Sequence, residues 1–305
     1  MSEHGPVTGP REHLRGLVLC VVGVTVISPD ALIIRAVDAD AWTIVGWRGF
    51  FTLVGTLMVL ALLRPGRTDA RRIRILPSRP HLFAGALFAA ASVAFVSALD
   101  RTDTASVLVI IAAGPLIASI LGRVFLHEPA HMRTWLTGAA VLVGLVVILG
   151  GSLGRGEIDG DLLALAGATC FAGYLTVSRA ARPADMTPAI GVGGAGAALA
   201  GLLAGADLTI GAGDLLLLAL LGVVILPVSL TLITRATHHL PAPEVNLIAL
   251  LETLLGPLWV WLALGETPST EVLAGGVLVV GAVTIHSALA LRAGADRDAA
   301  AGMAV

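Results

Sequence analysis

Apolar stretches of about twenty residues recur along the whole chain, separated by short connections. A membrane-spanning α-helix needs about twenty apolar residues to cross the hydrocarbon core of a bilayer. Several connections contain proline or glycine, as in Arg64-Pro65-Gly66, which is typical of turns. The stretches predict ten membrane helices, near residues 13–30, 41–63, 81–99, 105–126, 133–151, 161–180, 188–206, 214–234, 243–264 and 271–291.

The charge content also favours a membrane protein. Only 13% of the 305 residues are charged and 56% are apolar, whereas a soluble domain carries about 25% charged residues. Such a chain has too few charges to cover the surface of a soluble protein, so lipid must solvate much of it. The fold class that we expect is therefore an all-α integral membrane protein with membrane lipid as a partner.

All 19 basic residues are arginines, and their distribution predicts an orientation. Basic residues in short loops are retained on the cytoplasmic side of a membrane. With the N-terminus inside, fifteen arginines face the cytoplasm and three face outward, Arg35, Arg101 and Arg155, while Arg48 lies within a helix. We therefore expect a multi-pass protein of the bacterial inner membrane with both termini in the cytoplasm.

The chain contains an internal repeat of five helices. A shift of 138 positions superimposes Leu126-His127-Glu128 on Leu264-Gly265-Glu266 and Gly138 on Gly276. Because five is odd, the second unit enters the membrane upside down relative to the first. Inverted repeats are typical of secondary transporters, which alternate access to a site near the midplane of the membrane. The two expected units are residues 13–151 and 161–291 of one transmembrane domain.

Several short motifs accompany the repeat: Trp47-Arg48, the turn from Ala98-Leu99 to Ala105, Pro115 and the loops with Glu128 and Glu266. With these features the sequence resembles the drug/metabolite transporter superfamily, specifically its EamA type with two five-helix repeats. The resemblance covers residues 13–290 and implies a ten-helix basket whose central cavity is lined mainly by the first, third, fourth, sixth, eighth and ninth helices. It also implies export of amino acids or other metabolites.

Glu252 is a candidate functional residue and lies beside a departure from the family pattern. The family usually has Leu-Glu-Pro where this chain has Leu251-Glu252-Thr253, and the missing proline argues against a kink there. Glu252 lies about nine residues from either end of its helix, near the centre of the bilayer, where an ionisable group is costly unless it is paired, protonated or hydrated. We expect it to bind a substrate amine or a coupling proton. The alternative is a neutral acid that holds two helices together.

Two further positions combine charge with a membrane location. Arg48, preceded by Trp47, lies about two turns into the second helix. A planar guanidinium suits recognition of a carboxylate, so Arg48 and Trp47 are candidates for substrate binding, with snorkelling of Arg48 to the interface as the alternative. Ser28 and Asp30 flank a proline that interrupts the first stretch. They are candidates for an outer gate, or simply belong to a helix end and an interfacial turn.

Four other side chains complete the candidate set. Tyr174 is the only tyrosine and either lines a cavity or packs in the helix bundle. Asn246 either binds substrate or bridges helices, and Trp259 lies in an interfacial belt or at the mouth of the cavity. His286 is a second candidate for proton coupling, with a structural role as its alternative.

Small residues recur every four positions in the stretch 188–206. They are Gly193, Ala197, Gly201 and Gly205. Small-xxx-small patterns let membrane helices approach each other closely. We therefore expect this helix to pack tightly, with a hinge role for the glycines as the alternative.

The sequence gives little support to enzymatic, metal-binding or nucleic-acid-binding functions. The nearest metal cluster, His238-His239 with Glu244, is interrupted by prolines and does not share one helical face. The chain has no lysine and therefore no GxxxxGK[ST] nucleotide loop. The six arginines of residues 64–80 fit anionic lipid headgroups better than nucleic acid. We expect no enzymatic activity, no cofactor and no metal.

The function that we expect is secondary transport. Without an ATP site, a gradient of the substrate or of a coupled ion must drive the movement of solute. We expect a secondary transporter that exports a small-molecule substrate, such as an amino acid or another small polar metabolite, with proton coupling at Glu252 or His286. A channel or facilitator is one alternative, although no ring-forming polar filter is visible in the sequence. A membrane accessory protein without transport activity is the other.

Overall fold

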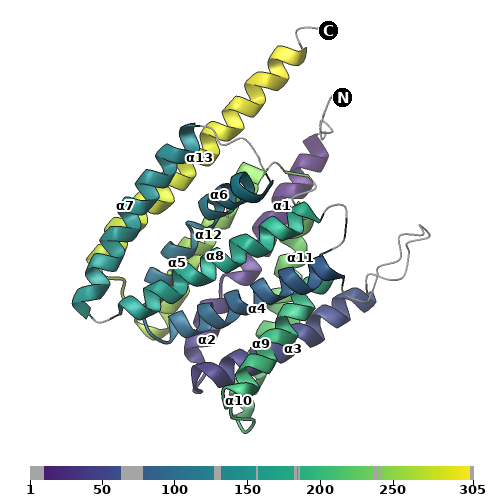
Figure 1. The fold of residues 1–305 in the computed structure, drawn as a ribbon, viewed down its shortest axis with the longest axis vertical. Coiled ribbons are helices and arrows are strands. Elements are labelled where there is room, and N and C mark those ends of the chain that lie inside the picture. Colours follow the sequence, from purple (N-terminus) through teal and green to yellow (C-terminus); the bar gives the residue numbers. More distant parts are fainter. Residues whose placement is uncertain are drawn as a thin grey trace.

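The computed structural model describes residues 10–62, 78–126, 132–155, 157–181, 184, 186–236, 239–240 and 242–302. These residues form one bundle of thirteen α-helices and one π-helix and contain no β-strand (Figure 1). The helices are α1 (Pro10–Ile27), α2 (Asp30–Ala36), α3 (Ala41–Leu62), α4 (Arg79–Leu99), α5 (Thr104–Ile111), α6 (Gly114–Leu126), α7 (Met132–Arg155), α8 (Ile158–Ala180), α9 (Thr187–Leu203), α10 (Ala212–Ala219), η1 (Leu220–Ile225), α11 (Leu226–Ala236), α12 (Ala242–Leu264) and α13 (Thr270–Gly302).

These elements combine into ten apolar spans, which confirms the predicted fold class. Six spans are long and apolar enough to cross a membrane, and the remaining four contain shorter apolar helices. The four are Leu136–Gly151, Thr187–Leu203, Leu251–Leu264 and Thr270–Ile285. The largest differences from the predicted boundaries lie at the two ends of the chain, where the first span continues through α2 to Ala36 and α13 continues to Gly302.

Three spans are interrupted next to a proline. The first breaks at Pro29 between α1 and α2, and the fourth breaks between α5 and α6, just before Pro115. In the eighth span the π-helix η1 precedes Pro227. Proline donates no backbone hydrogen bond, so an α-helix ends or widens at the turn before it. α12 continues as one helix through Thr253, where the family proline is missing, and also through Pro257, so not every proline interrupts a span.

The packing of the helices follows an approximate two-fold relation between the two halves. α3 packs on α9, and α7 packs on α13, so corresponding helices of the halves are neighbours. α1 packs against α11, and its counterpart α8 packs against α4, the counterpart of α11. This is the contact pattern expected of two inverted repeats.

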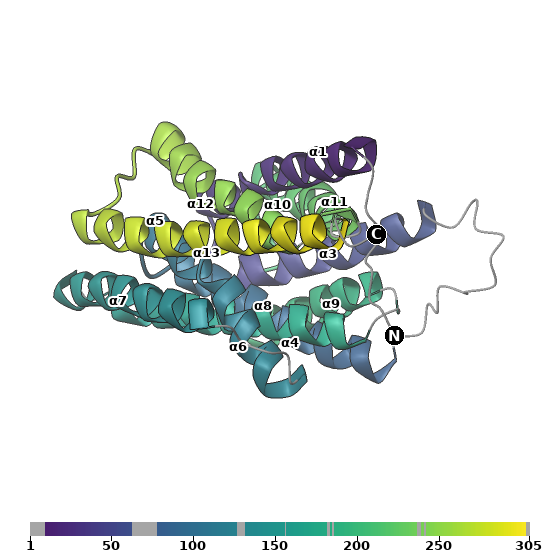
Figure 2. The same cartoon turned by 90° about the horizontal axis from the view of Figure 1, so that it is seen from above.

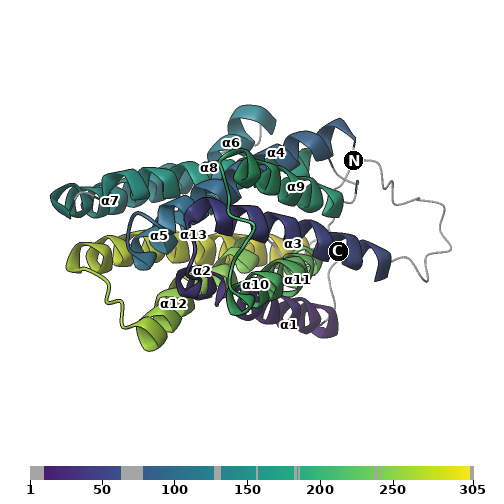
Figure 3. The same ribbon diagram turned by 90° about the horizontal axis from the view of Figure 1, so that it is seen from below.

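Both ends of the described chain lie at the same end of the bundle. In Figure 1, α1 begins and α13 ends at the top, while the connections that follow α2, α7, α9 and α12 lie at the opposite end. We call that opposite end the distal end. Figure 2 shows α13 running alongside α7, and Figure 3, seen from below, shows α2, α3 and α10 close together. The arrangement fits an even number of membrane crossings.

Glycines bring α3 and α9 into backbone contact. A Cβ added at Gly201 of α9 would lie 2.6 Å from the Cα of Gly46, and one added at Gly194 would lie 2.8 Å from the carbonyl oxygen of Gly49. Gly193 instead faces Phe88 of α4. Gly205 follows the end of α9 with a φ of 93°, a conformation that favours glycine. The predicted tight packing is therefore present, but it is directed at two different neighbours.

An aspartate caps the N-terminus of α3, which lies at the distal end. Asp40 Oδ1 accepts hydrogen bonds from the backbone N–H groups of Trp42 (2.9 Å) and Thr43 (3.1 Å). The Thr43 hydroxyl donates a hydrogen bond to Asp40 Oδ2 and accepts one from the backbone N–H of Asp207 (2.7 Å). These donors, the Thr43 hydroxyl first, hold the pKa of Asp40 below its usual value, which favours the charged form at a helix N-terminus.

The glycine contact between α3 and α9 predicts the effect of a single added methyl group. We expect Gly201→Ala to lower stability by about 1–3 kcal/mol, because the new Cβ would overlap the backbone of Gly46. The measurement is thermal unfolding of the purified protein in detergent. Gly213→Ala in α10 is the matched control, since a Cβ there meets nothing within 4 Å. Equal melting temperatures for the two variants would contradict the prediction.

Candidate functional site

A buried ion pair joins the first two spans. Nη2 of Arg48 lies 2.8 Å from Oδ2 of Asp30. Asp30 is the first residue of α2, and Arg48 lies about two turns into α3. Each residue is only 5% exposed. The structure thus brings together a predicted binding residue and a predicted gating residue, and the arginine is held inside the bundle.

Arg48 makes two further contacts, both with α4. Nη1 donates a hydrogen bond to Oγ of Ser92 at 2.6 Å, and the guanidinium carbon lies 5.9 Å from the centre of the Phe95 ring. Two buried atoms of the pair, Nε of Arg48 and Oδ1 of Asp30, have no hydrogen-bond partner among the described residues. Buried polar atoms without partners are costly. They leave one donor and one acceptor available to a further group.

The break at Pro29 determines where Asp30 lies. α1 ends at Ile27, and the Ser28 hydroxyl donates a hydrogen bond to the carbonyl of Thr25 at 2.9 Å. Oγ of Ser28 also accepts a hydrogen bond from Nε1 of Trp259 at 2.9 Å, which connects α12 to the break. Ser28 and Trp259, predicted separately as gating and binding residues, therefore contact each other directly.

Glu252 lies on the face of α12 that is directed at α1 and α2. It is spaced four residues from Ile248, which packs against the cluster containing Val24 of α1, and seven from Trp259, which contacts Ser28. Glu252 is partly exposed. It forms no hydrogen bond or ion pair with the described part of the chain. The carboxylate is therefore a candidate contact for a group that the described residues do not supply.

The other predicted residues lie elsewhere or outside the described part. Tyr174 is 7% exposed and stacks on Phe171, next to Phe88. Trp47 stacks on Phe51, and its indole donates a hydrogen bond to the carbonyl of Asp207 at the distal end (3.3 Å). Asn246 and His286 belong to α12 and α13, but their side chains lie outside the described residues. The binding and coupling roles of these four residues stay predictions.

A polar cluster at the distal end connects α2, α5 and α8 with the connections that precede α5 and α13. Nη2 of Arg35 donates hydrogen bonds to the carbonyl of Thr102 (2.7 Å) and to Oε1 of Glu266 (3.3 Å). Oε1 of Glu266 also accepts the backbone N–H of Thr104, the first residue of α5, at 2.6 Å. The Thr102 hydroxyl donates to Oδ1 of Asp161 on α8 at 3.0 Å. We call these five residues the distal polar cluster.

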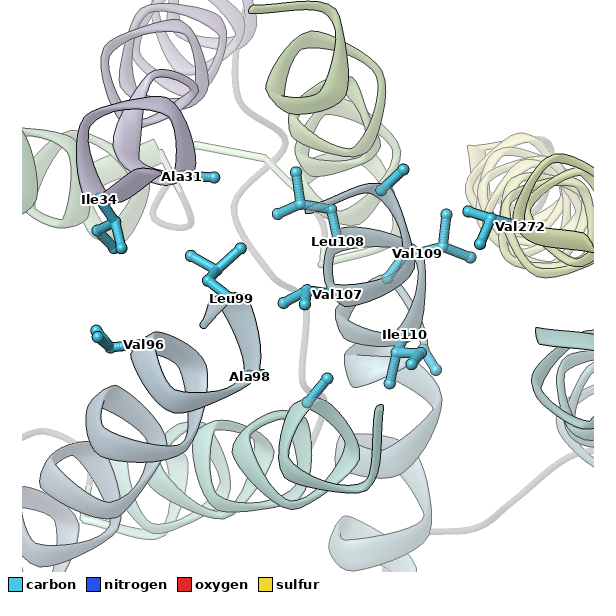
Figure 4. Close-up of a cluster of buried hydrophobic side chains, with 14 of the residues drawn as sticks. Ala31, Ile34, Val96, Ala98, Leu99, Val107, Leu108, Val109, Ile110 and Val272 are labelled. Carbon is cyan, nitrogen blue, oxygen red and sulfur yellow. The ribbon is translucent and has the colours of Figure 1, made fainter. Parts of the chain in front are cut away.

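An apolar layer lies between the ion pair and the distal polar cluster. Figure 4 shows Ala31 and Ile34 of α2, Leu99 of α4 and Val107 of α5 pointing toward a common centre. All four are at most 4% exposed. The layer begins directly after Asp30 on α2, so apolar packing and then polar contacts close the bundle on the distal side of the ion pair.

Sequence reasoning missed Ser92 and the distal polar cluster. A serine within an apolar helix is a weak signal, because such serines also hydrogen-bond to their own backbone. Glu266 was recognised as part of the repeated loop, but its contacts with Arg35 and Thr104 join residues more than 160 positions apart. Neither spacing nor composition predicts pairs of that kind.

Comparison with known proteins identifies the family. The EamA-like transporter family matches residues 14–150 and 158–288, one match in each half of the chain. A solved structure described as "Crystal structure of protein" is 19% identical, covers 90% of this chain and 97% of its own, and superposes with a TM-score of 0.64. At that identity it supports the fold alone. No match was found among curated proteins.

The two matched segments together span most of the sequence and coincide with the two sets of five spans. Such a protein is a membrane transporter of the drug/metabolite type. The chain therefore belongs to the EamA-like transporter family.

Proposed function

We propose that this protein is a secondary transporter that exports small polar metabolites, such as amino acids, across the bacterial inner membrane. Export is the direction that the family resemblance implies. With no nucleotide loop in the sequence, a gradient supplies the driving force, and a proton carried by Glu252 is the coupling that we infer. His286 is the second candidate for this role.

The observation that carries the proposal is the buried pair of Asp30 and Arg48. A fully buried charge pair contributes little stability compared with apolar side chains of the same volume. Ionisable groups inside a membrane protein usually mark the path of a substrate or an ion. Here the pair lies at a helix break and keeps a donor and an acceptor without partners among the described residues, and α12, which carries Glu252, packs against α2. These properties fit a binding site better than a structural contact.

The orientation that we propose places both termini in the cytoplasm. Described arginines gather at the end of the bundle where α1 begins and α13 ends, in agreement with the retention of basic residues on the cytoplasmic side. These arginines are Arg15, Arg79, Arg123, Arg179 and Arg235. The distal end is then periplasmic, and the structure corresponds to a state closed toward the periplasm.

Removal of the charges separates a structural role of the ion pair from a transport role. Arg48→Met leaves Asp30 buried and unpaired, so we expect a loss of stability of about 3–5 kcal/mol. The double variant Arg48→Met with Asp30→Asn carries no buried charge. We expect it to regain most of that stability but not the transport activity. Thermal unfolding in detergent and solute counterflow in proteoliposomes measure the two effects.

Arg15→Met is the control for this experiment, since Arg15 is exposed near the start of α1. It is expected to retain both stability and transport. A double variant that transported as fast as the unmodified protein would assign the ion pair a purely structural role.

Labelling of single cysteines tests the orientation. In a background with Cys20→Ala and Cys170→Ala, we expect an impermeant maleimide to label Leu208→Cys in intact cells. Ala184→Cys should react only after the membrane is permeabilised. Both positions are exposed, and they lie at opposite ends of the bundle. The reverse pattern would place the termini in the periplasm.

Flux measurements distinguish a carrier from the alternatives. We expect purified protein in proteoliposomes to show saturable counterflow with at least one solute from a panel of amino acids, nucleosides and amines. Flux that rises linearly with concentration and shows no counterflow would indicate a channel. The lack of any flux across the panel would favour an accessory protein.

A further inference from the structure

The charges inside the spans do not balance. Of the described carboxylates and guanidinium groups, Asp30, Arg48 and Glu252 lie inside the spans, while the others lie near the span ends. Arg48 is paired with Asp30. In its ionised form Glu252 therefore leaves one negative charge in excess among the described groups.

An excess carboxylate inside a membrane protein needs a compensating positive charge, because an uncompensated charge is costly in a medium of low dielectric constant. A proton on Glu252 can provide this positive charge. A bound solute with one net positive charge can provide it instead. A zwitterion brings no net charge and leaves the carboxylate uncompensated, and an anion increases the imbalance.

The free polar atoms around the pair fit the same kind of solute. Oδ1 of Asp30 is a buried acceptor without a partner, and Glu252 offers a second carboxylate that is partly exposed and unpaired among the described residues. Nε of Arg48 is a buried donor without a partner. Two acceptors that carry negative charge and one cationic donor suit a solute with two cationic groups and one carboxylate.

From this charge distribution we propose that the site selects solutes with one net positive charge, such as basic amino acids, and exchanges each of them for one proton. The proposal rests on the transport function proposed above and specifies its substrate class. The proton leaves the Glu252 carboxyl as the cation binds, and another proton binds when the cation departs. One positive charge moves in each direction, so the exchange is electroneutral.

One other carboxylate inside the spans, that of Asp30, lies on a helix that packs against α12. α12 packs against α1, α2, α5 and α13, and Asp30 is the first residue of α2. α5 carries no titratable side chain, and His286 and the charged residues beyond it on α13 lie outside the described side chains. The remaining titratable groups on these elements are Glu12, His13, Arg15 and Cys20 on α1, Arg35 on α2 and Glu271 on α13.

A series of amino acids that differ in net charge tests the proposal on the unmodified protein. L-arginine, citrulline and glutamate carry one positive, no and one negative net charge, and citrulline has nearly the shape of arginine. In proteoliposomes we expect a pH gradient to drive arginine uptake at least about tenfold above that of citrulline. One proton should move per arginine. A membrane potential imposed with potassium and valinomycin should leave the rate unchanged.

The variant Glu252→Gln tests the role of the carboxylate. We expect the preference for arginine over citrulline to fall by about tenfold or more and the response to the pH gradient to disappear. Glu252→Asp, which keeps the charge, should retain both. Glu12→Gln is the matched control, because Glu12 is exposed at the start of α1 and the same substitution there should change neither rate nor preference.

The outcomes separate this proposal from the transport function itself. Equal exchange of arginine and citrulline, or arginine uptake driven by the membrane potential, would overturn the substrate class and leave transport intact. Counterflow of other solutes without any arginine transport would do the same. No flux of any solute would overturn the transport function and this inference with it.

Discussion

The buried contact between Arg48 and Asp30 is the constraint around which the first half of this protein is arranged. A guanidinium cannot remain within a membrane span without a counter-charge, and no carboxylate on α3 itself could supply one. The break at Pro29 solves this by opening the first span at the level where Arg48 needs a partner. Ser92 then occupies a second nitrogen of the guanidinium, so three spans are tied together at one point.

Much of the fold follows from local features of the sequence. Apolar length alone predicts the ten spans, and the prolines at 29 and 115 mark two of the breaks, because a residue without a backbone N–H affects only its own turn. The extension of α13 to Gly302 was not predicted. Its last turns are rich in alanine and contain arginine, which favour helix, but with their arginines and aspartates they are not apolar enough to mark a span.

The candidate site was predictable only in part. Glu252, Arg48 and Asp30 stand out because a charge within an apolar stretch is costly wherever it points. Their partners do not stand out, because pairing depends on how the spans rotate and which of them touch. Ser92 and the bond between Trp259 and Ser28 join helices distant in sequence. Tyr174 was a candidate because it is the only tyrosine, but its ring packs among phenylalanines.

The π-helix in the eighth span has a consequence for helical phase. Each turn of η1 accommodates one residue more than an α-turn, so α10 and α11 are out of step by about 100°, the angular width of one residue. α10 thereby directs one side toward α2 and α3 while α11 directs a differently phased side toward α1. The two parts of this span therefore face different neighbours with differently phased sides. α4, the corresponding span of the first half, makes its contacts as an unbroken α-helix.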